Sequence, residues 1–69
     1  MKFLIRDLKN GNFYRSPGVW VAATNLAVRI GSKEEALRIM EGQDLSNFEL
    51  LGLLPDGTPS IGFNMSGLT

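Results

Sequence analysis

Apolar and polar residues alternate along the first third of the chain with a period of two, which is typical of β-strands. Two turn signals interrupt this alternation: Asn10-Gly11, which favours a two-residue hairpin turn, and Ser16-Pro17-Gly18. The pattern therefore predicts a three-stranded antiparallel β-meander within residues 1–22. Its strands are expected at residues 2–8, 12–16 and 18–22.

The pattern changes to a helical period at residues 32–42. Ser32 and Glu35 have the spacing of a capping box, in which each side chain accepts a hydrogen bond from the other's backbone N–H. Gly42 suits the left-handed conformation that follows a helix. A helix this short is not stable alone, so we expect it to pack on the meander. Its apolar stripe consists of Ala36, Leu37 and Met40.

Two further segments fit more than one type of structure. Residues 23–30 can form a helical turn capped by Thr24, which we favour slightly, or a strand in which alternate residues are apolar. Residues 47–54 contain a second capping-box pattern, but Gly52 interrupts it and a Pro55-Asp56-Gly57 turn follows. We therefore favour a C-terminal β-hairpin over residues 47–63, followed by a mobile tail at 64–69. The prediction is a single α+β domain over residues 1–69.

The leucine-rich strand predicts self-association. Its leucines alternate between both faces, and one helix cannot cover both faces of a sheet. We therefore expect a second copy of the chain to bury the other face in a homodimer. The candidate interface residues are Leu50, Leu51, Leu53 and Leu54.

Composition narrows the chemistry. The chain has no cysteine and no histidine, so it lacks disulfides and the side chains on which most nucleophilic and acid–base catalysis depends. It also lacks a glycine-rich phosphate-binding loop. We expect a protein that is not an enzyme and needs no cofactor or metal. The charged N-terminus is unlike a signal peptide and no apolar run is long enough to span a bilayer, so we expect a cytoplasmic protein without membrane contact.

Charge is distributed unevenly along the chain. Residues 1–33 contain six basic side chains and one acidic one, whereas residues 34–69 contain six acidic side chains and one basic one. If Arg6 and Arg15 share a face of the first hairpin, their repulsion favours a bridging anion. Trp20 is either a stacking platform or the core anchor of a small domain. The candidate binding residues are Arg6, Arg15, Trp20, Arg29 and Lys33.

The order of these features resembles that of two groups of proteins. Trp20, Ala27, Ile30, Ser32 and Glu34-Glu35-Ala36 resemble a pattern in short uncharacterised bacterial and phage-type proteins, which implies no activity. Residues 30–36 also resemble, more weakly, the helix start in the DNA-binding domains of phage integrases, where a three-stranded sheet precedes one helix. That resemblance implies that Arg6, Arg15 and Trp20 lie on or near a DNA-reading sheet, although the aromatic residue after the glycine is missing here.

These patterns do not identify a biochemical function by themselves. Our first hypothesis is a non-catalytic interaction or accessory module that self-associates. The alternative is a nucleic-acid-binding protein that uses the basic N-terminal sheet. Its contacts would come from Lys2, Arg6, Lys9, Arg15 and Arg29.

Overall fold

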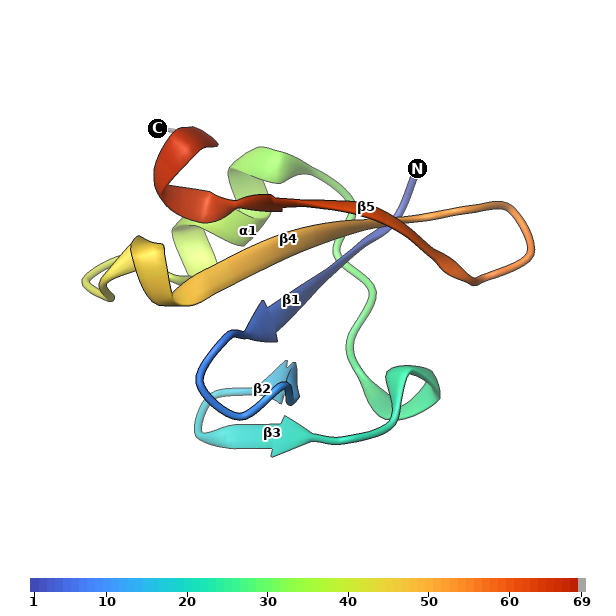
Figure 1. The fold of residues 1–69 in the computed structure, drawn as a ribbon, viewed down its shortest axis with the longest axis horizontal. Helices are drawn as coiled ribbons and strands as arrows, with labels where there is room; N and C mark the ends of the chain where they lie inside the picture. The colour runs from blue at the N-terminus through green and yellow to red at the C-terminus, as the bar shows by residue number, and fades with distance from the viewer. Residues whose placement is uncertain (69) are drawn as a thin grey trace.

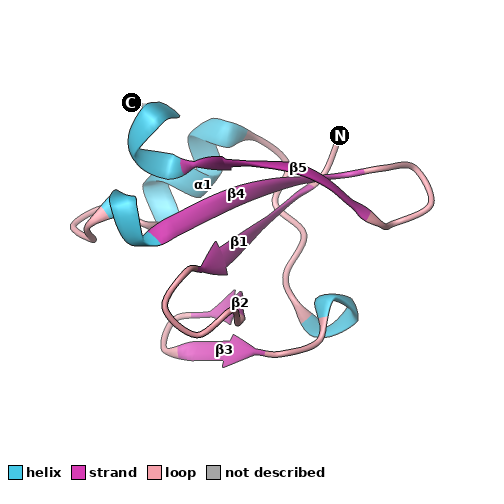
Figure 2. Cartoon of the chain, viewed as in Figure 1, coloured by secondary structure: helices cyan, strands magenta, loops and turns pink. Residues whose placement is uncertain are grey.

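The computed structural model describes residues 1–68, and these residues form the predicted α+β fold with five strands and one α-helix (Figures 1 and 2). Three single-turn 3-10 helices lie at Thr24–Leu26, Leu45–Asn47 and Met65–Leu68. The helix α1 covers Lys33–Ile39. The strands are β1 (Phe3–Asp7), β2 (Phe13–Ser16), β3 (Val19–Val21), β4 (Phe48–Leu53) and β5 (Pro59–Asn64).

The strands form one antiparallel sheet in the order β3-β2-β1-β4-β5. β1 therefore lies at its centre, and β4 lies between β1 and the edge strand β5, with Leu4 opposite Leu51. Figure 1 shows α1 against one face of the β1–β4–β5 part, while the β2–β3 hairpin diverges from β1. The edge strands of the sheet are β3, which has three residues, and β5, which has six.

The turn between β1 and β2 differs from the prediction. The Asp7 N–H donates to the carbonyl of Asn12 at 2.7 Å, so the loop contains the four residues 8–11 instead of two. A two-residue type I′ turn needs positive φ at both central residues, but only Gly11 has it, at 75°. The side chains of Asp7 and Asn10 each accept a bond from the N–H two residues later, and these local bonds favour the longer loop.

The other two hairpin turns occur where the sequence predicts them. Gly18 has φ of 76° after Pro17, the arrangement of a type II turn. In the β4–β5 hairpin, the Gly57 N–H donates to the Leu54 carbonyl and the Leu54 N–H to the Thr58 carbonyl, both at 2.8 Å. Gly57 has φ of 87°, so glycine supplies the left-handed position of this three-residue loop.

The connection from β3 to α1 contains both structures that the sequence allowed. Thr24–Leu26 forms the 3-10 turn, and the chain is extended at Ala27. The predicted cap is wrong, because Thr24 is the first residue of the turn, Ala23 occupies the cap position and no side chain caps the turn. Ile30 then exchanges two backbone hydrogen bonds with Phe3, of 2.8 and 2.9 Å, while the Val28 N–H donates to the Tyr14 carbonyl at 3.1 Å. The connection thus fills the space where the β2–β3 hairpin diverges from β1.

The start of α1 is close to the predicted capping box. The Ser32 hydroxyl accepts a hydrogen bond from the Glu35 N–H at 3.1 Å. The Glu35 carboxylate accepts from the N–H of Gly31 at 3.2 Å, one residue before the expected partner. The helix ends at Ile39, before the predicted Glu41, and Gly42 has φ of 85° in the turn that follows.

The interior strands β1 and β4 contribute to a hydrophobic cluster on each face of the sheet. The helix-side cluster contains Ile5, Ile30, Ala36, Met40, Phe48, Leu50 and Met65. The opposite cluster contains Leu4, Ala27, Leu51 and Leu53, with Phe13 and Val21 packed against it. The β2–β3 hairpin and its connection therefore cover, within one chain, the face that α1 cannot reach.

Residues 64–68, which the sequence predicts to be part of a mobile tail, have regular secondary structure. Asn64 is the last residue of β5, and Met65–Leu68 forms a 3-10 helix. The Met65 side chain is fully buried in the helix-side cluster. Burial of one methionine side chain ties this segment to the core. Thr69 lies outside the described residues.

Candidate functional sites

The leucines that suggested a dimer interface lie mainly inside the chain. Leu50 belongs to the helix-side cluster, and Leu51 and Leu53 belong to the opposite one. Only Leu54, beyond the end of β4, is exposed, at 45%. The argument that β4 needs a second copy therefore fails, because the β2–β3 hairpin covers its second face.

The arginines of the first hairpin do not face each other. The register places Arg6 opposite Phe13, and its guanidinium lies 3.7 Å from the carboxylate of Glu49 in an ion pair across β1 and β4. Arg15 instead donates to the carbonyl of Leu26 in the 3-10 turn. Each arginine thus has an intramolecular partner, and the predicted anion bridge between them is not needed.

The structure places Arg15 and Arg29 at the same short turn. Nη1 of Arg29 donates to the carbonyls of Ala27 and Thr24, at 3.1 and 3.3 Å. Together with the bond from Arg15 to Leu26, these contacts satisfy carbonyls at the end of the 3-10 helix. Two of the predicted ligand-binding cations therefore hold the connection in place.

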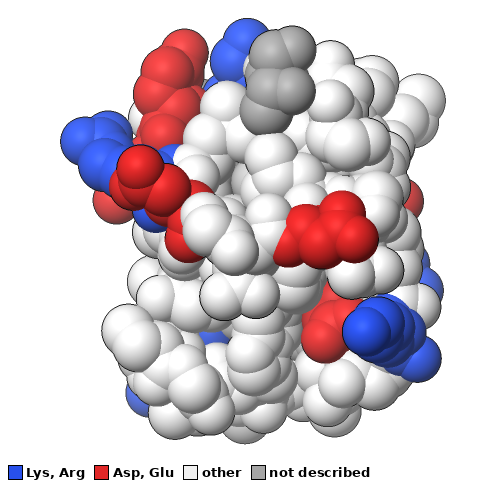
Figure 3. Space-filling view, turned by 90° about the vertical axis from the view of Figure 1, so that its left-hand side faces the viewer, with Lys and Arg blue, Asp and Glu red and all other residues white. Residues whose placement is uncertain are grey.

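Lys33, the remaining cation of the predicted binding set, lies beside acidic residues. Lys33 is exposed at the first position of α1, and Glu34 and Glu35 directly follow it. On the face drawn in Figure 3, Lys and Arg lie close to Asp and Glu, and uncharged surface separates these groups. Nucleic-acid binding through the basic residues stays a prediction, without a continuous basic patch on this face.

Trp20 lies at the boundary between core and surface. Its ring stacks on Phe48, with centroids 5.6 Å apart and planes at 20°, and meets Tyr14 edge-on at 5.5 Å. The three rings line a cleft of about 380 Å³ between the β2–β3 hairpin and the end of α1. Asp7 and Gln43 contribute polar groups to the same cleft. Trp20 thus joins the hairpin to the helix-side cluster while part of its ring stays accessible.

The β5 edge strand carries a surface that our sequence interpretation missed. Ile61 is 75% exposed and Phe63 is 58% exposed, although both are large apolar side chains in a β-strand. β5 pairs with β4 on one side only, because it is the last strand of the sheet. No charged residue occurs among residues 57–69. The missing charge was the sequence signal that could have identified this edge.

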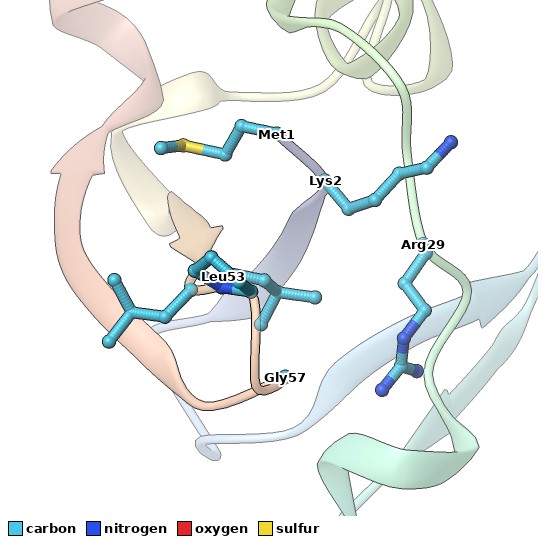
Figure 4. A pocket seen from close by; sticks show the side chains of 7 residues that line it. Met1, Lys2, Arg29, Leu53 and Gly57 are labelled. Atoms are coloured by element: carbon cyan, nitrogen blue, oxygen red, sulfur yellow. The ribbon is translucent and has the colours of Figure 1, made fainter.

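A pocket of about 530 Å³ lies at the opposite end of the β4–β5 hairpin from the 3-10 helix Met65–Leu68. Figure 4 shows Leu53 and the turn at Gly57 on one side and Arg29 across from them. Met1 and the aliphatic stem of Lys2 close a third side. Both charged side chains that line this pocket, Lys2 and Arg29, are basic.

The carboxylates serve local turns. The pKa of Asp44 is lowered by hydrogen bonds from the Ser46 hydroxyl and N–H, and the pKa of Asp56 is lowered in the same way by Thr58.

Among residues 1–68, no three acidic side chains are grouped so that they could hold a metal ion. Within the same range, no helix combines the length and apolarity that a membrane span requires.

Comparisons with protein-family models, with characterised proteins and with solved structures give no match to this chain. The resemblances to phage-type proteins and to integrase DNA-binding domains therefore stay predictions. Functional inference rests on the geometry of the sites described above.

Proposed function

We propose that this protein is a non-catalytic interaction module that self-associates through the outer edge of β5. One observation supports this proposal above the others: a six-residue edge strand that exposes Ile61 and Phe63 and carries no charge. Edge strands present unpaired backbone N–H and C=O groups, and most monomeric proteins protect them with charges, bulges or short strands. The non-catalytic part of the proposal rests on the lack of histidine and cysteine.

The two edge strands of the sheet differ in how far they are open to pairing with another strand. β3 has only three residues, and a short edge strand offers little backbone for pairing. β5 is twice as long and carries no charge. Pro59 at its first position cannot donate a hydrogen bond, and the register with β4 shifts between Leu51 and Leu53, so these two features protect only the turn end of the strand. Addition of a strand is therefore expected at β5.

A second copy of the chain fits this edge for an electrostatic reason. Antiparallel pairing of β5 with itself brings no like charges together, because the strand has none. The formal net charge of the whole chain is also zero, so two copies do not repel each other strongly. In the resulting dimer, Ile61 and Phe63 of each copy would pack against those of the other, and the two sheets would become continuous.

Charge-swap variants at Ile61 test this proposal. We expect wild-type protein to sediment as a dimer at high micromolar concentration, and Ile61→Lys or Ile61→Glu alone to sediment as monomers. An equal mixture of the two variants should dimerise again, because opposite charges then meet across the strands. Ile61 is 75% exposed in the monomer, so neither variant should prevent folding.

The matched control is Val19→Lys, which places a charge at a 44% exposed valine on the other edge strand. This variant should keep the wild-type sedimentation. A monomeric wild type at high micromolar concentration would overturn the proposal, as would equal disruption by the Val19 and Ile61 variants.

A further inference from the structure

A second candidate site is the pocket at the turn end of the β4–β5 hairpin. Its volume of about 530 Å³ lies within the range of about 300–1,000 Å³ that is typical of small-molecule sites. Leu53, Leu54, Pro55 and Met1 give it an apolar lining. Leu54 and Met1 are exposed, at 45% and 79%, so a ligand here would cover apolar surface that the chain itself leaves in water.

The charges around the pocket have one sign. Arg29 faces the apolar side across the pocket, whereas the ammonium of Lys2 extends away from the pocket toward Gly31 (Figure 4). Asp56 belongs to the same hairpin turn, but its Oδ1 already accepts hydrogen bonds from the N–H and hydroxyl of Thr58. The pocket therefore combines an apolar wall with basic groups, and no acidic side chain lines it.

Arg29 is held in position before any ligand arrives. Both of its hydrogen bonds, to the carbonyls of Ala27 and Thr24, come from Nη1. Its Nε and Nη2 donors are left for another acceptor, since a guanidinium has five N–H groups in a planar fork. A carboxylate matches this fork in shape and charge.

We propose that this pocket binds a small organic carboxylate with an apolar body. The carboxylate would accept hydrogen bonds from Arg29, and the apolar body would lie against Leu53 and Leu54. Lys2 would cover the ligand with its aliphatic stem and keep its ammonium in water. This inference does not depend on self-association through β5.

Binding of octanoate, followed by NMR shifts of the backbone amides of Leu53, Leu54 and Gly57, tests this proposal. Octanoate should shift these amides at lower concentration than octanol, and octylammonium should bind weakest. Arg29→Gln and Lys2→Gln should each weaken octanoate binding by about two- to fivefold, which is typical for loss of an exposed ion pair. Leu54→Asp, which puts an acid at an exposed position of the pocket, should abolish binding without affecting the core.

The matched control is Lys33→Gln, which removes an exposed positive charge outside the pocket and should not change octanoate binding. Equal binding of octanol and octanoate would overturn the proposed anionic ligand, as would a Lys33 variant as weak as the Arg29 variant. In the Ile61→Lys background, where association through β5 is blocked, shifts of these amides with protein concentration alone would identify a second copy of the chain as the occupant and would also overturn the proposal.

Discussion

At the scale of single residues, the contact between Glu49 and Gly62 links β4 to the edge strand β5. An ideally placed Cβ on residue 62 would lie 2.5 Å from Cδ of Glu49, closer than real Cβ contacts. The same Glu49 side chain forms the ion pair with Arg6. Glycine at position 62 thus leaves the space in which the Glu49 carboxylate can reach across to β1.

A double-mutant cycle measures this coupling. We expect Gly62→Ala to lower the free energy of unfolding more in the wild-type background than in a Glu49→Ala background. The difference between the two losses should be at least about 0.5 kcal/mol. In the wild-type background, the added methyl group forces the Glu49 carboxylate away from Arg6. In the Glu49→Ala background, no carboxylate is there to be displaced. Chemical denaturation at low protein concentration gives the four free energies of unfolding, and additive effects would contradict the proposed contact.

At the scale of elements, the ends of α1 depend on a few polar contacts. The helix has only seven residues, and Ala36 is its single buried residue. The Ser32 hydroxyl satisfies the N–H of Glu35, and the Glu35 carboxylate satisfies that of Gly31. A helix this short gains much of its stability from such caps and from packing on the sheet.

Removal of the cap should therefore destabilise the domain. We expect Ser32→Ala to lower the free energy of unfolding by about 1 kcal/mol, the usual effect of losing an N-cap side chain. Ser32→Asp should retain most of the wild-type stability, because aspartate also accepts the bond from the Glu35 N–H. Thermal unfolding followed by circular dichroism distinguishes these outcomes, and equal losses in both variants would refute the role of the cap.

At the scale of the whole molecule, burial on both sides of β4 is achieved within one chain. α1 and the Met65–Leu68 segment contribute to the cluster on one face, while the β2–β3 hairpin and Ala27 contribute to the other. The interaction surface that we propose is therefore the edge strand β5 and not the interior strand β4. Self-association is consequently expected to be separable from folding, because the core does not require the second copy.

Two leucine variants test this separation. Leu51→Ala should destabilise the chain by about 2–5 kcal/mol, because it leaves a cavity in a packed core. Leu54→Ala, at an exposed position, should change the free energy of unfolding by less than about 0.5 kcal/mol. In the concentration range where the chain is monomeric, these two changes in the free energy of unfolding should not depend on protein concentration. A large concentration dependence for Leu51→Ala would instead indicate that this leucine lies in an intermolecular interface.

Much of the fold follows from the sequence because its signals act locally. Positive-φ glycines at positions 11, 18 and 57 mark the three hairpin turns, and Ser32 marks the helix start. The length of the first turn was less predictable, since hydrogen bonds from two neighbouring side chains favour four residues over two. The ends of the first three strands also differ from the predicted ones by one residue at most positions.

The candidate sites depend on contacts between distant parts of the chain, which the sequence pattern does not encode directly. The sequence shows that Arg6 and Arg15 are basic, but not what they contact. In the folded chain, Arg6 forms an ion pair with Glu49 and Arg15 donates to the carbonyl of Leu26. The leucines of residues 50–54 are apolar in any arrangement, but only the divergent hairpin covers the second face of β4. The sequence determined the turns, the cap and the α+β class, because those depend on residues a few positions apart. The tertiary structure decided which apolar groups stay exposed and which cations line a pocket, because both depend on what packs from elsewhere in the chain.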